Sequence, residues 1–239
     1  NKDTTFFVYM PFYTVHTPIM GKPDLIKKFE GKEGSNGQNR AEYAAMVASM
    51  DANVGRLLLS LKENGLEDNT MVIFTSDNGG IRSISEQNPL RAGKGSYYEG
   101  GIRVPLVIKW PGKIEPGSVS HEQVSNLDFY PTLQRIADPP KKTVELDGMA
   151  LQPIFKGEKL AERELFFHFP IYLQYYDQLK DDGRDALFRT RPGSVIISGD
   201  WKLHEYFEDG GLELYNLKDD IGEQQNVAKK NPKKKEGTA

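Results

Sequence analysis

The clearest periodicity in the chain is a set of hydrophobic residues spaced three and four apart, which predicts one long amphipathic helix. The set comprises Tyr43, Met46, Val47, Met50, Val54, Leu57, Leu58 and Leu61. Asn64 and Gly65 follow it and supply a stop signal. Residues 70–76 are largely apolar without alternation, which is typical of a parallel strand covered on both faces. Since this strand follows the helix directly, we expect the stripe to pack on a sheet rather than on a partner helix.

Two more apolar runs predict core strands in the first part of the chain. One covers residues 5–10, and the other covers 102–110, where Pro105 indicates an edge position or an irregular ladder. A short helix is expected over 128–137, with its first residue near the N-cap and Pro131 in the first turn. Helix and strand alternate here, which predicts an α/β layer with its site at the carboxyl ends of the strands.

Beyond residue 138 the pattern changes. Pro and Lys residues at 138–142 form a break, and a short helical stretch follows at 150–155. Short strands come next, at 165–169, 195–198, 200–207 and 212–216, and a Glu-Asp-Gly-Gly hairpin signal at 208–211 joins the last two. We therefore predict a partial α/β domain over residues 1–140, a linker over 141–163 and a smaller antiparallel α+β subdomain over 164–239.

Composition and charge exclude several classes of protein. The chain has 239 residues, with 31 Lys and Arg against 34 Asp and Glu, for a net charge of −3. This balance offers no basic field for nucleic acid, and no apolar run approaches the ~18 residues of a membrane span. The absence of Cys excludes disulfides, thiolate metal sites and cysteine nucleophiles.

Asp77 and Asn78 are the first candidates for chemistry. They stand at the carboxyl end of the strand predicted over 70–76, and Gly79 and Gly80 follow them. A carboxylate and an amide oxygen are hard donors that suit Ca²⁺ or Mg²⁺. An ordinary turn is the alternative, because Asp, Asn and Gly are turn formers.

Lys94 lies between Gly93 and Gly95, and a cation on a flexible backbone suits an anionic substrate. A solvated surface lysine is the alternative. The spacing of a P-loop is absent. Glu99 and Arg103 are close enough in sequence to pair as a structural clamp.

The chain has four histidines. His16 lies in the segment YTVHTP that follows the first predicted strand, so we expect it to face the same crevice as Asp77. His168 lies in a strand, His121 in a loop and His204 in a strand near the end of the chain. A structural role is the alternative for each.

These segments stand in a characteristic order. HTP at 16–18 is followed by the long helix, VIFTSDNGG, GKGSYYEGGIRVPLVIKWPG, DFYPT, GDWKL and LELYNL. From about residue 6 to 228 the chain resembles the C-terminal half of a type I sulfatase, within the alkaline phosphatase-like superfamily. The resemblance implies that Asp77 and Asn78 bind one divalent cation, usually calcium. It also implies that Lys94 contacts the sulfate ester near its bridging oxygen, and that His16 contacts the sulfate and protonates the leaving group.

The nucleophile of these enzymes is a formylglycine made within a C/S-x-P-x-R motif, which this sequence lacks. We therefore expect the nucleophile-bearing N-terminal half to lie outside this chain, and the chain alone to be inactive. Two alternatives stay open: a non-catalytic remnant that binds calcium or sulfated glycans, and a phosphodiesterase or phosphonate hydrolase of the same superfamily.

The substrate is expected to be a sulfated small molecule or glycan. His168 and the aromatic residues after it are candidates to line a sugar subsite, and packing against the main domain is the alternative. The resemblance implies a periplasmic, secreted or lysosomal protein. The lack of Cys and of N-x-S/T sequons favours the bacterial periplasm.

Overall fold

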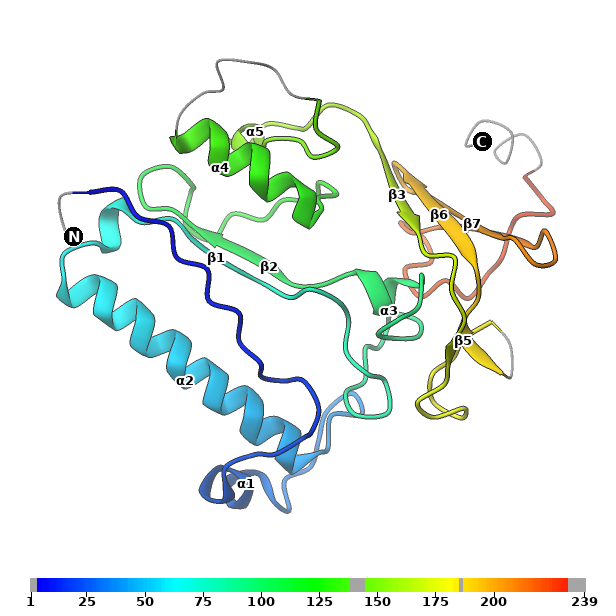
Figure 1. Ribbon diagram of the computed structural model, residues 1–239, viewed down its shortest axis with the longest axis horizontal. Helices are drawn as coiled ribbons and strands as arrows, with labels where there is room; N and C mark the ends of the chain where they lie inside the picture. The colour runs from blue at the N-terminus through cyan, green and yellow to red at the C-terminus, as the bar shows by residue number, and fades with distance from the viewer. Residues whose placement is uncertain (1–3, 138–144, 185–186, 232–239) are drawn as a thin grey trace.

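The computed structural model describes residues 4–137, 145–184 and 187–231, and Figure 1 shows its two parts. The first contains the long helix α2 and the strand pair β1–β2, and the second contains a four-stranded antiparallel sheet with the order β3-β6-β7-β8. A separate short pair, β4–β5, lies beside the larger sheet (Figure 1). This mixed α/β architecture, with an antiparallel sheet late in the chain, confirms the predicted fold class. The break predicted at 138–142 lies outside the described residues.

The long helix is confirmed as α2, Ala41–Glu63, and it ends at Asn64 with Gly65 at a φ of 67°. A shorter helix, α1 (Pro23–Phe29), packs against it. The apolar stripe of α2 is only partly covered. Met46 is buried, whereas Val47 and Leu57 are 38% and 41% exposed. The expectation that the stripe packs on a sheet is therefore not met, because the described residues leave much of that face open.

The strand predicted over 70–76 is β1, Val72–Thr75, and it pairs antiparallel with β2, Leu106–Lys109. The prediction of a parallel strand covered on both faces is wrong, since Phe74 is 38% and Val107 61% exposed. β2 is shorter than predicted. Ile102, the first residue of the predicted strand, is the last residue of the helix α3 (Glu99–Ile102). The strand begins after Pro105, which has no N–H to donate to a ladder.

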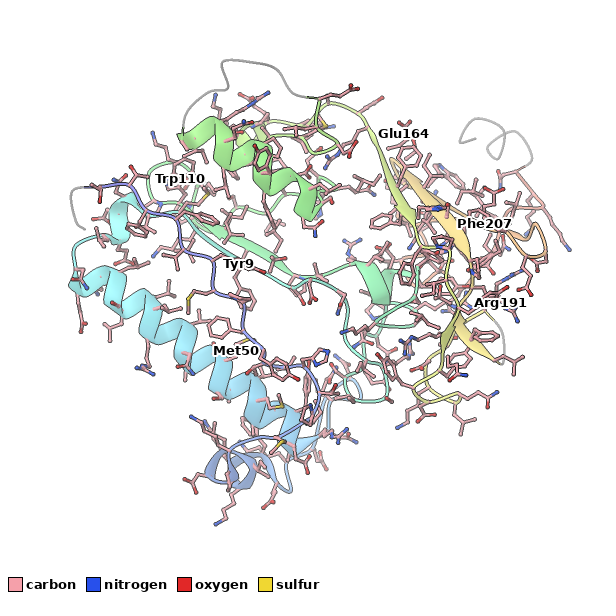
Figure 2. All side chains as sticks on the ribbon, viewed as in Figure 1. Tyr9, Met50, Trp110, Glu164, Arg191 and Phe207 are labelled. Carbon is pink, nitrogen blue, oxygen red and sulfur yellow. The ribbon has the colours of Figure 1, made fainter. Side chains whose placement is uncertain are left out.

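Residues 5–10 form no strand, which corrects the first of the predicted core strands. Phe7 and Tyr9 are 73% and 76% exposed. A strand needs a neighbour to satisfy its backbone groups, and within the described chain β1 and β2 pair only with each other. The segment instead crosses the view between α2 and the β1–β2 pair (Figure 1), where Figure 2 labels Tyr9.

The helix predicted over 128–137 begins with a short 3-10 turn, η2 (Asn126–Asp128), and continues as α4 (Phe129–Ala137). Asp128 is not the N-cap. It occupies position N3 of a capping box whose N-cap is Ser125. Buried Asp128 also pairs with Arg163 at 2.5 Å and accepts from the Met149 N–H at 2.8 Å. The segment leading from α5 (Gln152–Phe155) to the sheet is thereby fixed to α4.

The C-terminal sheet is confirmed strand by strand. Its members are β3 (Glu164–His168), β6 (Gly193–Ser198), β7 (Trp201–Tyr206) and β8 (Leu212–Asn216). The predicted hairpin at 208–211 joins the antiparallel pair β7–β8. Two short strands were not predicted, β4 (Leu173–Gln174) and β5 (Phe188–Thr190), which pair with each other. No helix within the described ranges is long and apolar enough to cross a membrane.

Candidate active site

Two loops and the helix α3 meet beyond the end of β1. The Gly79 N–H donates to the Gly101 carbonyl at 2.9 Å, and the Lys94 N–H donates to the Gly80 carbonyl at 2.8 Å. The Gly100 N–H donates to the Arg91 carbonyl at 2.8 Å. The loop carrying Asp77 and Asn78, the loop carrying Lys94 and the helix α3 are thus joined backbone to backbone. We call this arrangement, residues 77–80, 91–96 and 99–101, the loop cluster.

Glycine makes this close approach possible. A Cβ on Gly79 would lie 1.8 Å from the Gly100 carbonyl oxygen, and one on Gly100 would lie 2.3 Å from the Ala92 carbonyl oxygen. No side chain fits at either position. The glycines therefore hold Lys94 near Asp77 and Asn78 along the backbone.

The side chains of Asp77 and Asn78 are suited to a cation. Asp77 is exposed, and no hydrogen bond to its carboxylate occurs within the described chain. The Asn78 Nδ2 donates to the Gly79 carbonyl at 2.9 Å, which leaves its Oδ1 as an acceptor. Two hard oxygens fit part of a calcium site, since Ca²⁺ takes 6–8 oxygen ligands. Among the described residues no group of three or more His, Asp or Glu is arranged to hold a metal, so a complete site needs further ligands.

Lys94 lines a small pocket together with Arg82, Tyr176, Asp181 and Arg189. The last three come from the segment around β4 and β5, so this segment lies against the loop cluster. Sequence reasoning missed Arg82 and Arg189 as site residues, whereas Tyr176 belongs to the aromatic stretch after His168 that it offered either as a sugar subsite or as packing against the main domain. Nothing in the sequence around them marks their contact with Lys94, because the contact depends on how a distant irregular segment folds back.

His16 is exposed, and its Nδ1 lies 2.8 Å from the Thr17 carbonyl oxygen. Its ring packs against Tyr13, with 5.4 Å between the ring centroids. None of its hydrogen bonds or ring contacts within the described chain is to Asp77, Asn78 or Lys94. Its convergence with those residues stays a prediction.

His168 projects from the exposed side of β3, where its Nδ1 lies 2.7 Å from the Ser194 Oγ and its ring faces Phe207 at 5.7 Å. The alternate residues Leu165 and Phe167 pack on the other side of the strand, in the cluster that contains Tyr97. His168 therefore points away from Tyr97, and its role in substrate binding stays a prediction. His121 is exposed.

A buried cluster of charges joins α3 to the C-terminal sheet. The Lys202 Nζ lies 2.9 Å from a carboxylate oxygen of Glu99 and 2.9 Å from one of Glu223, and Glu223 is 3.0 Å from the His204 Nε2. The predicted pair of Glu99 and Arg103 is confirmed at 3.2 Å. Lys202, Glu223 and His204 are fully buried. We call Glu99, Lys202, His204 and Glu223 the charge cluster.

Burial and the neighbouring charges shift the pKa values within the charge cluster. Burial lowers the pKa of His204 below its usual 6.5, because an imidazolium would lose its hydration. Burial acts to raise the pKa of Glu223, but the hydrogen bond from His204 and the charge of Lys202 outweigh it and hold that pKa below 4.5. The carboxylate of Glu223 is thus ionised beside a neutral His204 near pH 7.

Comparison with known proteins identifies the family of this chain. The family model described as Sulfatase matches residues 1–139, and the one described as N-sulphoglucosamine sulphohydrolase, C-terminal, matches residues 93–237. The chain belongs to the sulfatase family. A "Sulfatase" of Formosa agariphila is 40% identical across 96% of this chain and 43% of its own length. Human arylsulfatase A is 36% identical across 72% of this chain and 32% of its own length.

Solved structures show the same fold. Ps i-CgsB superposes with a TM-score of 0.75 at 31% identity, over 95% of this chain and 47% of that one. BT4656, in complex with D-glucosamine-2-N,6-O-disulfate, has a TM-score of 0.63 at 25% identity, over 89% and 42%. A phosphonate monoester hydrolase of Agrobacterium radiobacter has 0.59 at 29% identity, over 83% and 39%. The chain spans less than half the length of these proteins, and the fold is alkaline phosphatase-like.

Proposed function

We propose that the protein to which this chain belongs hydrolyses sulfate esters. The observation that carries the proposal is the loop cluster, which brings an exposed carboxylate, an amide oxygen and a lysine onto one set of hydrogen-bonded loops. Positive charge beside a sulfate stabilises the negative charge that develops on its oxygens during hydrolysis. The membership of the sulfatase family supports the same reaction.

Each residue has a defined part in this proposal. Asp77 and Asn78 hold one calcium ion, which neutralises sulfate oxygens when it is bound. The Lys94 ammonium contacts the sulfate near the bridging oxygen, and His16 gives a proton to the alcohol oxygen as its bond to sulfur breaks. The nucleophile is a formylglycine hydrate from the part of the protein that precedes this chain, which also supplies the remaining calcium ligands.

The substrate in this proposal is a sulfated saccharide. Two similar solved structures are complexes with carbohydrates: BT4656 with D-glucosamine-2-N,6-O-disulfate, and Ps i-CgsB with k-i-k-neocarrahexaose. In this chain the rings of Tyr172 and Phe188 lie 5.1 Å apart, Phe188 belongs to β5 as Arg189 does, and Tyr172 is 45% exposed. Aromatic faces of this kind suit sugar rings. We also propose the bacterial periplasm as the location, on the family resemblance.

The test compares Asp77→Ala with His121→Ala in the full-length protein on a chromogenic aryl sulfate. Asp77→Ala is expected to lower turnover about 100-fold or more, because it removes a charged ligand of the cation. His121→Ala, which changes an exposed loop residue, leaves turnover unchanged. The 239-residue chain alone is expected to give no turnover with or without calcium. Turnover that survives repurification and is lost in Asp77→Ala would refute the placement of the nucleophile.

The similarity to a phosphonate monoester hydrolase favours one second candidate, hydrolysis of phosphonate monoesters. The same variants are assayed on an aryl phosphonate monoester. A higher kcat/KM for the phosphonate than for the sulfate would replace the sulfatase proposal with this one. Calcium or glycan binding with no turnover on either ester would instead favour a non-catalytic remnant.

A further inference from the structure

Arg189 occupies an unusual position beside Lys94. It comes from β5, and its guanidinium lies over the ring of Tyr176, with 3.7 Å from the guanidinium carbon to the ring centroid. Its Nε is 2.8 Å from the point where a Cβ on Gly95 would stand. The guanidinium is thus held between an aromatic face and the backbone that follows Lys94.

The Arg189 charge has no carboxylate partner within residues 4–137, 145–184 and 187–231. Its Nε is buried and makes no hydrogen bond there. The carboxylate that shares its pocket, Asp181, accepts the Tyr176 N–H at 2.6 Å and the Asp177 N–H at 3.2 Å, and it stands beyond ion-pair distance of Arg189. Lys94 likewise has no ion pair among these residues.

Two other arginines, unlike Arg189, have carboxylate partners. Arg184 also lies over a tyrosine, with 4.1 Å to the ring of Tyr206, but it pairs with Asp209 at 2.6 Å. Arg82 is 3.5 Å from Glu86. A buried donor left without an acceptor is costly, and a charged one more so. Arg189 differs from these arginines because it leaves a buried donor unpaired, and together with part-exposed Lys94 it forms a pair of cations that suits an anionic ligand.

We propose that Arg189 binds a second anionic group of the substrate, a sulfate or a carboxylate next to the ester that Lys94 contacts. This inference rests on the proposed function and adds a requirement to it: the preferred saccharide carries at least two negative groups. A guanidinium presents parallel N–H donors that match the oxygens of sulfate and carboxylate. Stacking on Tyr176 fixes the plane of these donors before the substrate arrives.

The test uses the full-length protein and matched pairs of saccharide sulfate esters. Within each pair one member carries only the scissile sulfate, and the other carries a second sulfate or, in a separate arm, a carboxylate. The quantity measured is the ratio of kcat/KM for the doubly charged member to that for the singly charged member. Arg189→Met is expected to lower this ratio about tenfold or more, since a charge-assisted hydrogen bond is lost. Arg189→Lys should recover part of it.

Arg184→Met is the matched control, because it removes an arginine stacked on tyrosine whose charge is already paired. It should leave the ratio unchanged. An unchanged ratio in Arg189→Met, or an equal fall in Arg184→Met, would overturn the proposal and leave Arg189 with a packing role on Tyr176. The two arms show whether the second group is sulfate or carboxylate.

Binding of the same saccharides by calorimetry separates this proposal from the proposed function. If the protein hydrolyses no member of the panel but binds the doubly charged members, and only Arg189→Met weakens that binding, the Arg189 site stands and the sulfatase proposal fails. If turnover is present and the ratio is insensitive to Arg189, the sulfatase proposal stands and the Arg189 site fails.

Discussion

The two parts of the chain differ in how completely they bury their own residues. In the C-terminal sheet Val195 is 1% and Leu214 0% exposed, and even the charged Lys202 is fully buried. In the first part Phe7 and Tyr9 are 73% and 76% exposed, although their sequence is as apolar as that of a core strand. Large apolar residues are thus buried in the C-terminal sheet and exposed in the first part of the chain.

The difference follows from the topology of each part. β6, β7 and β8 are consecutive along the chain and pair antiparallel, so each strand finds its neighbour through a short turn. β1 and β2 form a two-stranded ladder, and two strands alone are marginal in water. The stability of this chain therefore resides mainly in the C-terminal sheet and in what the charge cluster attaches to it.

Breaking the charge cluster should have the largest effect on stability. Lys202→Met leaves the carboxylates of Glu99 and Glu223 buried without their shared cation, and we expect a loss of about 3–5 kcal/mol in unfolding free energy. Urea unfolding of the chain measures it. The matched control, Glu67→Gln, removes the exposed pair with Lys109 (2.6 Å) and should leave the midpoint unchanged. Equal effects of the two variants would contradict the contrast between the two parts.

Removing apolar side chains from each part tests burial directly. Leu214→Ala should cost about 2–5 kcal/mol, because it leaves a cavity beside Leu203 and Ala228. Tyr9→Ser should change the free energy of unfolding by less than about 0.5 kcal/mol in this chain, as for an exposed position. A large loss in Tyr9→Ser would show that residues 5–10 are packed after all.

Two glycine variants compare a position that is closely packed in the loop cluster with one that is open in α2. Gly79→Ala places a methyl group against the Gly100 carbonyl and should cost about 1–3 kcal/mol as the loop cluster shifts. Gly55→Ala, in α2 with no heavy atom within 4 Å of its Cβ position, should stabilise the chain by about 0.5–1 kcal/mol. Thermal midpoints should move in opposite directions, and a shared direction would contradict the contact between the loops.

The smallest expected effect is a pH slope. The lowered pKa of His204 means that the folded chain binds fewer protons than the unfolded chain below pH 6.5, so stability should fall as the pH decreases from there. The slope from this residue is at most about 1.4 kcal/mol per pH unit. His204→Gln should flatten it, whereas His121→Gln should not. Glu223 adds a further loss below about pH 4.5, as its carboxylate is protonated.

Sequence reasoning predicted the elements whose partners are local. The hairpin at 208–211 was predicted because its turn residues and both strands lie within a few residues of one another. The prediction of a strand over residues 5–10 was wrong, because an apolar run in the sequence does not identify the strand that would pair with it. Asp77, Asn78 and Lys94 were recognisable as candidates from their motifs. The structure joins their loops through Gly79 and Gly80, which sequence reasoning also singled out, and through Gly100, which it did not.

The residues that sequence reasoning missed depend on long-range contacts. Lys202 and Tyr206 were not singled out; they alternate along β7 with His204, for which a structural role had been the alternative. The alternation suggests a solvent-facing side, yet this is the side that meets α3. Arg189 lies in a short strand with no recognisable signal. Its significance arises only because Gly95 and Tyr176 approach it from other segments.

The loop that carries Lys94 is fixed at both ends. At one end the Lys94 N–H donates to the Gly80 carbonyl. At the other end the Tyr97 hydroxyl donates to the Gly193 carbonyl at 2.8 Å, and Glu99 belongs to the charge cluster. Fixing one residue's backbone costs about 1–2 kcal/mol in conformational entropy. Folding has already met that cost here, so under the proposed function the sulfate would not have to order this loop, and the C-terminal sheet would raise its affinity without touching it.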